Sequence, residues 1–211
     1  MPTIEEAREW YADADIVHDF DHVLRVLRTA EYLSEIEGAD LEIIQAAALL
    51  HDVEGATPDG VNRHDHHHSS ADFAAVVLKK EGWPEDRISA VLHCILAHRY
   101  RDNSNPPSTL EAKILFDADK LDVLGAIGIA RVIAYAALAG TPFYAKPSEK
   151  FLLTGEEESG EVHSAYHEHL FKLRKVPDRL FTTTAKSLAA ERLKILEGFF
   201  QQLIKEWEGN I

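Results

Sequence analysis

The sequence is poor in cysteine and in basic residues. Its 211 residues include a single cysteine, Cys94, so a disulfide within the chain is excluded. Lys and Arg number 22 against 36 Asp and Glu, which gives a formal net charge of −14. Because an acidic surface repels the phosphate backbone of duplex nucleic acid, we do not expect a duplex-binding protein. A phosphorylated small molecule remains compatible with this charge, since a bound divalent cation can reverse the local field.

The sequence also lacks a segment that is typical of export or of membrane insertion. Residues 1–6 are acidic and have neither the basic nor the apolar region of a signal peptide. The apolar stretch 123–139 contains Arg131, and its uninterrupted part is too short to cross a bilayer. We therefore expect a cytoplasmic protein without a membrane partner, in which 123–139 is a buried core helix. Gly125 and Gly128 are expected to let another helix approach closely.

No stretch alternates polar and apolar residues with a period of two, so a substantial sheet is not expected. The apolar periodicity is helical, and the predicted helices are 3–12, 21–37, 41–51, Ser69 or Ser70 to 81, 84–98, 110–138 with a break near Asp117, 163–175 and 178–207. Loops are predicted at 53–68 and 101–108, and an insertion or flap at 140–160. The prediction is one all-α domain over residues 1–211, with a core of about 15–140 and a helical extension of about 141–211.

Two adjacent metal-capable side chains, His51 and Asp52, end the apolar helical run 41–50. Burying such groups is costly unless something pairs with them, and His nitrogen with carboxylate oxygen suits a divalent metal ion. His22 and Asp119 lie on helical segments of their own, and helices of a bundle can project side chains to one point. Two His and two carboxylates leave coordination positions open for water and substrate, which is typical of a catalytic site.

The order of these residues resembles the H…HD…D signature of the HD-domain metal-dependent phosphohydrolase superfamily. The segments around these residues, 18–26, 49–52 and 117–131, are similar to the small stand-alone bacterial and archaeal HD hydrolases. The C-terminal segment 185–207 is similar to them too. The resemblance covers about residues 15–207 and implies an all-α HD-domain helical bundle with a C-terminal helical extension. It also implies the metal ligands, which are His22, His51, Asp52 and Asp119. One divalent ion is expected, with Mn, Fe, Ni, Zn, Co and Mg all open, and a second ion is an alternative.

Hydrolysis by metal-activated water requires cations that stabilise the charge developing on the phosphoryl group. The candidate cations are Arg25, one turn after His22, Lys120, next to Asp119, and Arg131. Glu54 and Asp117 are candidates for general acid or base catalysis; either could instead orient a histidine. His18, four residues before His22, would share its helix face and is a candidate for substrate binding.

The remaining histidines give an ambiguous signal. His93 and His98 are five residues apart, a rotation of roughly 140° on a helix, so they are not expected to face one site together. We favour His93, for substrate binding or for a second ion. In the cluster from His64 to His68 we expect His64 and His66 to be solvated, and His67 or His68 to reach the site.

The leading hypothesis is a metal-dependent phosphohydrolase, either a nucleotide pyrophosphohydrolase or a phosphatase, that acts on a nucleotide or a related phosphate ester or anhydride. A small phosphorylated substrate is the expected partner, and the chain is expected to be a monomer or a homodimer. Two alternatives stay open at this point: a di-iron oxygenase of the same superfamily, which would need six ligands, and a non-catalytic nucleotide-binding sensor. A purely structural bundle would not need the His51-Asp52 pair.

Overall fold

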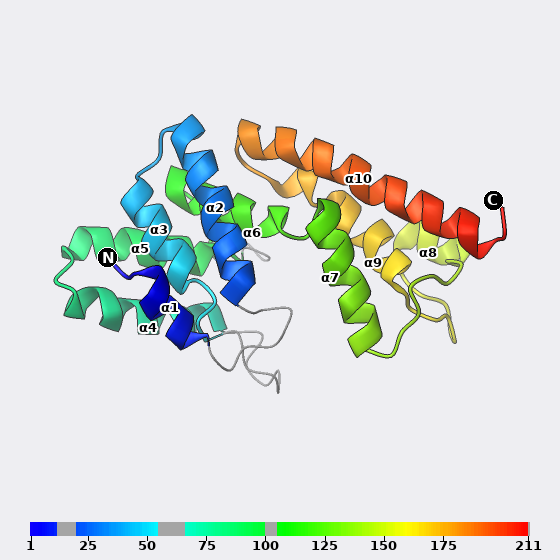
Figure 1. The fold of residues 1–211 in the computed structure, drawn as a ribbon, viewed down its shortest axis with the longest axis horizontal. Helices are drawn as coiled ribbons and strands as arrows, with labels where there is room; N and C mark the ends of the chain where they lie inside the picture. Colours follow the sequence, from blue (N-terminus) through cyan, green and yellow to red (C-terminus); the bar gives the residue numbers. More distant parts are fainter. Residues whose placement is uncertain (12–19, 55–65, 100–104, 211) are drawn as a thin grey trace. The chain divides into compact units, whose positions relative to one another are not determined.

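The computed structural model describes residues 1–11, 20–54, 66–99 and 105–210 (Figure 1). Its α-helices are α1 (Ile4–Trp10), α2 (Phe20–Glu37), α3 (Leu41–Leu50), α4 (His66–Lys80), α5 (Glu85–Ala97), α6 (Leu110–Leu121), α7 (Gly125–Leu138), α8 (Glu149–Thr154), α9 (Ala165–Phe171) and α10 (Thr183–Trp207). Two short 3-10 turns, η1 (Leu173–Lys175) and η2 (Pro177–Arg179), precede α10. The described residues contain no strand, so the all-α prediction is confirmed.

The turn between α2 and α3 follows directly from its residue types. Gly38 ends α2 with a φ of +82°, a conformation that costs glycine least. Asp40 then caps α3, because its side chain accepts hydrogen bonds from the backbone N–H groups of Glu42 and Ile43 at 3.1 and 3.2 Å. This short connection sets α3 beside α2.

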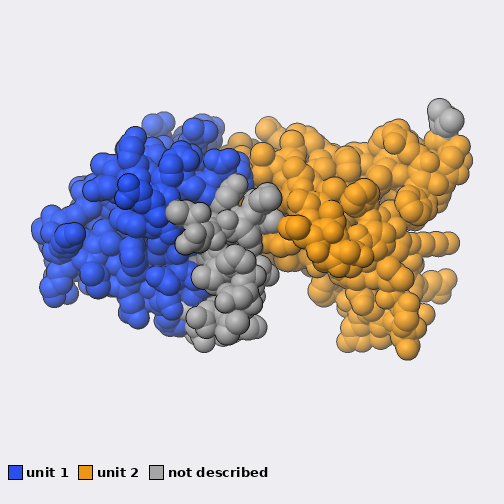
Figure 2. All heavy atoms as spheres, turned by 60° about the horizontal axis from the view of Figure 1, so that its bottom comes forward, with its two compact units in different colours: residues 1–119, 180–185 blue, residues 120–179, 186–211 orange. Residues whose placement is uncertain are grey.

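The chain divides into two compact units, coloured separately in Figure 2. Unit 1 comprises residues 1–119 and 180–185, and unit 2 comprises residues 120–179 and 186–211. In unit 1, α3 packs against both α2 and α5, and α4 packs against α5. Almost the whole of α3 is buried, including Ile44 and Leu50, so this helix is the centre of the unit and places its C-terminal end inside the protein.

Unit 2 is built around the buried side of α10. Leu196 and Phe200 of that helix are fully buried, and the backbone N–H groups of Ala165 and Tyr166 donate to carbonyls of the segment before α8. The C-terminal extension was expected from about residue 141, whereas this compact unit begins at Lys120 and so includes α7. The organisation of residues 1–211 as one domain stays a prediction.

Three predicted boundaries were wrong. Helix α4 begins at His66, three or four residues before the expected caps, and Ser70 is buried inside the helix with its hydroxyl accepting from the Glu54 N–H at 3.2 Å. The break in 110–138 falls at 122–124, and the next helix starts at Gly125 with a φ of +69°. Helix α10 begins at Thr183 instead of 178 because a buried carboxylate on α6, described below, binds the two preceding amides.

Among the described helices, none alone has the length and apolar character needed to cross a membrane. Helices α6 and α7 reach that length only when they are counted together across the break between them.

Candidate metal centre

His51 is held as a neutral imidazole by its place at the end of α3. The side chain is fully buried, and its Nδ1–H donates to the Ala48 carbonyl at 2.8 Å, so the lone pair lies on Nε2. Burial is the largest cause that lowers the pKa of His51, to about 4. Among the described residues the buried Nε2 has no hydrogen-bond partner. A neutral ring with a buried, unused lone pair is the form in which histidine binds a metal ion.

Three of the four expected ligands meet at this nitrogen. His22 comes from the first turn of α2 and Asp119 from the last turn of α6, and ligand-capable atoms of these two residues and of His51 all lie within 4.8 Å of one another. His22 Nε2 is 3.5 Å from Asp119 Oδ1, and the His22 and His51 rings are 5.6 Å apart. His22 is buried, and Asp119 is partly exposed. The three side chains can therefore share one ion.

Asp52 belongs to a second cluster that adjoins the first through the His51-Asp52 peptide. Its Oδ1 lies 3.0 Å from His66 Nε2 and 3.4 Å from His98 Nε2. Ligand-capable atoms of these three residues also lie within 4.8 Å of one another. Burial opposes ionisation of Asp52, but the neighbouring histidines lower the pKa of its carboxyl well below the usual value. The two clusters are close, since the His51 and His98 rings are 5.1 Å apart.

His66 and His98 are the site residues that the sequence prediction missed. The expectation that His66 is solvated was wrong, because His66 is 7% exposed. His98 lies in the cluster, whereas His93 accepts hydrogen bonds from the Ser108 N–H and pairs with its hydroxyl at 2.9 Å. A sequence signal was available for His98, because like His51 it follows the last residue of a helix. In the structure its Nδ1 lies 2.5 Å from the Ile95 carbonyl.

The residues present fit divalent metal ions. Each cluster offers two histidine nitrogens and one carboxylate oxygen. This donor set suits transition metals better than calcium or magnesium. A ring N–H bonded to a backbone carbonyl, as in His51 and His98, is the usual way a protein orients a metal-binding histidine.

Asp117 of α6 binds the segment that precedes α10. Its buried carboxylate accepts from the Phe181 N–H at 2.9 Å, the Thr182 N–H at 2.8 Å and the Thr182 hydroxyl at 2.7 Å. These bonds fasten residues 180–185 to α6, two residues before Asp119. The contacts give Asp117 a positioning role.

The remaining described side chains that were predicted for the site lie outside the two donor clusters. Arg25 lies one turn after His22 on α2 and is half-buried, while the Glu54 side chain is exposed. Lys120 follows Asp119 directly, in the last turn of α6. Arg131 forms an ion pair with the buried Asp122 inside unit 2. His18 and His64 lie outside the described residues, and His67 and His68, whose rings are 4.2 Å apart, belong to neither described cluster.

Tyr11 supports the end of α3, and nothing in the sequence pattern pointed to it. Its buried hydroxyl donates to the Leu49 carbonyl at 3.1 Å, one of the last carbonyls of the helix that carries the His51-Asp52 pair. Burial, reinforced by the Asp52 carboxylate, raises the pKa of Tyr11, so the hydroxyl stays protonated and keeps donating.

Comparisons with known proteins agree with this architecture. Residues 19–124 match the model of the HD domain. The uncharacterized protein YpgQ of Bacillus subtilis (strain 168) is 33% identical over 97% of this chain and 94% of its own length. The crystal structure of Bacillus subtilis YpgQ in complex with ADP has a TM-score of 0.74, with 28% identity over 99% of this chain and 100% of that one.

A crystal structure of an HD-superfamily hydrolase from Bacillus thuringiensis is similar too, with a TM-score of 0.71 and 30% identity over 97% of this chain and 94% of that one. The HD pair with its buried histidine, the match over residues 19–124 and the similarity over nearly the whole chain agree with one another. The chain therefore belongs to the HD-domain family.

Proposed function

We propose that the chain is a metal-dependent phosphohydrolase that acts on a nucleotide or a related phosphate ester or anhydride. The observation that carries the proposal is the pair of donor clusters that adjoin at His51 and Asp52. His22, His51 and Asp119 would hold one ion, with Asp52 completing the predicted ligand set. Asp52, His66 and His98 are the residues that would hold a second.

The family relationship supports hydrolysis, and a relative's ligand supports the substrate class. One similar solved structure is that of an HD-superfamily hydrolase from Bacillus thuringiensis, and another is that of a predicted HD-superfamily hydrolase from an uncultured Thermotogales bacterium. YpgQ, whose structure covers nearly the whole of this chain, binds ADP in one crystal structure. We therefore propose a small phosphorylated substrate, which is compatible with the net charge of −14 because a bound divalent cation can reverse the local field.

A divalent ion bound here would polarise a phosphoryl oxygen and lower the pKa of a water molecule beside it. The protein's own part is to keep His51 neutral by burial and to orient the His51 and His98 rings through their bonds to the Ala48 and Ile95 carbonyls. Arg25 and Lys120 are our candidates for binding the phosphate oxygens, Arg25 because it lies one turn from His22, and Lys120 because it adjoins Asp119.

Product analysis tests the proposal. Metal-stripped protein is supplied with Mn²⁺ and with nucleoside mono-, di- and triphosphates, and the released compounds are identified. Pyrophosphate with a monophosphate would establish a pyrophosphohydrolase, and inorganic phosphate from monophosphates a phosphatase. The proposal would be contradicted if the metal-stripped protein released as much phosphate or pyrophosphate as the metal-loaded protein. It would also be contradicted if the metal-loaded protein released neither from any compound.

A di-iron oxygenase is the second candidate, and one observation favours it. Such a site needs six protein ligands, and the two clusters together contain six: His22, His51, Asp119, Asp52, His66 and His98. Iron content, colour and an electron-spin signal of protein produced with iron would distinguish it. Two irons per chain with a spin-coupled spectrum, together with no phosphate release, would replace the phosphohydrolase by the oxygenase.

A further inference from the structure

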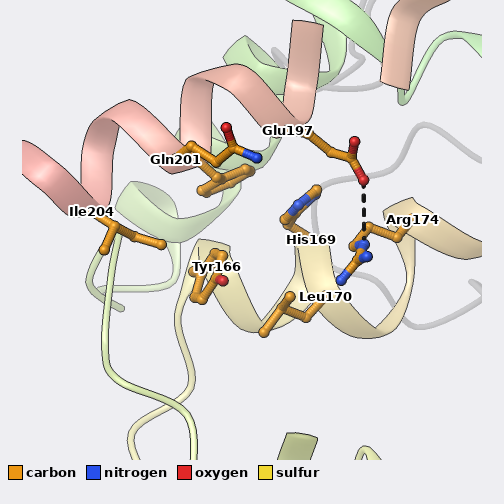
Figure 3. A pocket seen from close by; sticks show the side chains of 8 residues that line it. Tyr166, His169, Leu170, Arg174, Glu197, Gln201 and Ile204 are labelled. Atoms are coloured by element: carbon orange, nitrogen blue, oxygen red, sulfur yellow. Dashed lines mark ion pairs between the residues drawn. The ribbon is translucent and has the colours of Figure 1, made fainter. Parts of the chain in front are cut away.

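A hollow of about 290 Å³ lies between α9 and α10 inside unit 2 (Figure 3). Three α9 residues at helical spacing form one side and three from α10 the other: Tyr166, His169 and Leu170 facing Glu197, Gln201 and Ile204. None of these side chains belongs to the proposed metal centre. The size is at the lower end of small-molecule sites, so the hollow suits a compact ligand.

The imidazole of His169 is a buried polar group without a hydrogen-bond partner among the described residues. The side chain is 3% exposed, and its ring stacks on Phe200 with centroids 4.6 Å apart and 17° between the planes. No hydrogen bond between described residues involves this ring, and its Nδ1 is buried without a partner. A buried nitrogen without a partner costs free energy. Burial, and then the Arg174 charge, lower the pKa of His169 to about 4, so the ring is neutral.

One end of the hollow carries two opposite charges. Arg174 and Glu197 form a loose ion pair, with 3.5 Å between Nε and Oε1, and their side chains are 51% and 35% exposed (Figure 3). A ligand with one charge would be attracted by one of these groups and repelled by the other. A ligand that presents a carboxylate beside an ammonium group satisfies both, because a guanidinium binds a carboxylate through two N–H groups and a carboxylate accepts from an ammonium.

The other end of the hollow carries no charged side chain. Ile204 lies at the end opposite Arg174, with Gln201 between it and Glu197. Tyr166 lies below, and Leu170 lies between Tyr166 and Arg174 (Figure 3). The Tyr166 ring is tilted against its aromatic neighbours, by 45° to Phe200 and by 50° to Tyr144. Among the described residues, the lining thus has no pair of parallel open rings between which a flat base could stack. An apolar side chain fits this end better than a purine does.

We propose that this hollow binds a free amino acid with an apolar or aromatic side chain. Its carboxylate would bind Arg174, its ammonium group Glu197, and its side chain would lie toward Ile204. The neutral His169 ring forms part of the wall between the two ends. The site is independent of the proposed hydrolysis, so either proposal can fail without the other.

Calorimetric titration of the full chain tests the site with L-leucine and L-phenylalanine. The controls are phenethylamine, which lacks the carboxylate, and 3-phenylpropanoate, which lacks the ammonium group. We expect saturable binding of an amino acid that is at least about tenfold tighter than binding of either control. Arg174→Gln and Glu197→Gln should each weaken it at least about tenfold. Lys172→Gln, at an exposed lysine paired with Glu168, should leave it unchanged.

Three results would overturn the proposal. The first is no saturable binding of either amino acid up to about 10 mM. The second is equal binding of the amino acid and a single-charge control, or binding that neither variant weakens. The third is binding of guanosine or adenosine that Arg174→Gln removes while the amino acids do not bind, which would make the hollow a nucleoside site. Circular dichroism of each variant shows whether it is folded, and neither Arg174 nor Glu197 is a buried side chain on which the fold depends.

Discussion

At the scale of single residues, the candidate centre depends on how four histidine rings are oriented. His51 and His98 each follow a helix and bind a carbonyl three residues back, which aims Nε2 of each ring inward. His22 and His66 instead lie in the first turns of α2 and α4. The same residue type thus enters the centre from both ends of helices, and only its backbone position distinguishes a donor from a surface histidine.

Replacing His51 by Ala should remove bound metal, because the variant loses the buried nitrogen that has no other partner. His93→Ala is the matched control, since His93 is bonded to Ser108 and should leave metal content unchanged. Elemental analysis after dialysis measures the ions per chain, with circular dichroism as the check of folding. Unchanged metal content in His51→Ala would remove this residue from the centre.

The sequence predicted His22, His51, Asp52 and Asp119 as a set because their order and neighbours are distinctive, and the structure brings them together in two adjoining clusters. It did not predict His66, since the local pattern of 53–68, with its glycines, proline and histidines, is typical of a loop. The helical start at His66 depends on tertiary burial of the side chain beside Asp52, which no local pattern encodes.

His169 makes stability depend on pH. Its folded pKa is about 4 and its unfolded pKa about 6.5, so between these values the unfolded chain binds more protons at this residue. Its contribution to the free energy of unfolding should therefore be complete above about pH 6.5 and fall toward pH 4, by at most about 1.4 kcal/mol per pH unit. Denaturant unfolding of the native chain and of His169→Phe, at pH 7 and pH 5, measures this. Identical pH dependence in both would contradict it.

At the scale of elements, buried polar contacts tie together segments that lie far apart in the sequence. Asp117 on α6 binds Phe181 and Thr182, and Glu37 at the end of α2 accepts from the Thr184 N–H at 2.9 Å. The helices that carry Asp119 and His22 are thus both bonded to residues 180–185. The sequence indicated each helix from its period but could not show this connection, because the partners are more than sixty residues apart.

Asp117→Ala should lower the free energy of unfolding by about 3 kcal/mol or more, because it leaves buried N–H and hydroxyl donors of Phe181 and Thr182 without their acceptor. The milder Thr182→Val removes one of these bonds and should cost about 1 kcal/mol. Chemical denaturation measures both. A cost for Asp117→Ala no larger than that for Thr182→Val would contradict the positioning role.

Gly128→Ala should destabilise the protein by about 1–3 kcal/mol or more, since a Cβ there would lie 2.1 Å from the Val123 carbonyl oxygen. The close approach of another helix that was predicted at Gly125 and Gly128 is found at Gly125, which meets Arg192 of α10. It was wrong for Gly128, which meets the turn before its own helix. Gly198→Ala on α10 is the control: nothing lies within 4 Å, so it should stabilise by about 0.5–1 kcal/mol. Thermal unfolding compares the two, and equal effects would refute the packing argument.

At the scale of the whole molecule, the HD pair lies in unit 1 and the proposed amino-acid site in unit 2. Length, acidic charge and helical period were enough to predict an all-α chain with a C-terminal helical extension. The division at Lys120 was not predicted, because the apolar pattern continues through 110–138 and the break depends on the backbone of Gly125.

The most direct test of the central claim follows phosphate or pyrophosphate release while Mn²⁺ is added back to metal-stripped protein, with native chain and His51→Ala side by side. The account predicts no release before metal is added, release that rises until the donor clusters are filled, and none from His51→Ala at any metal concentration. Release by the stripped protein, or equal release by His51→Ala, would contradict a phosphohydrolase centred on the His51-Asp52 pair.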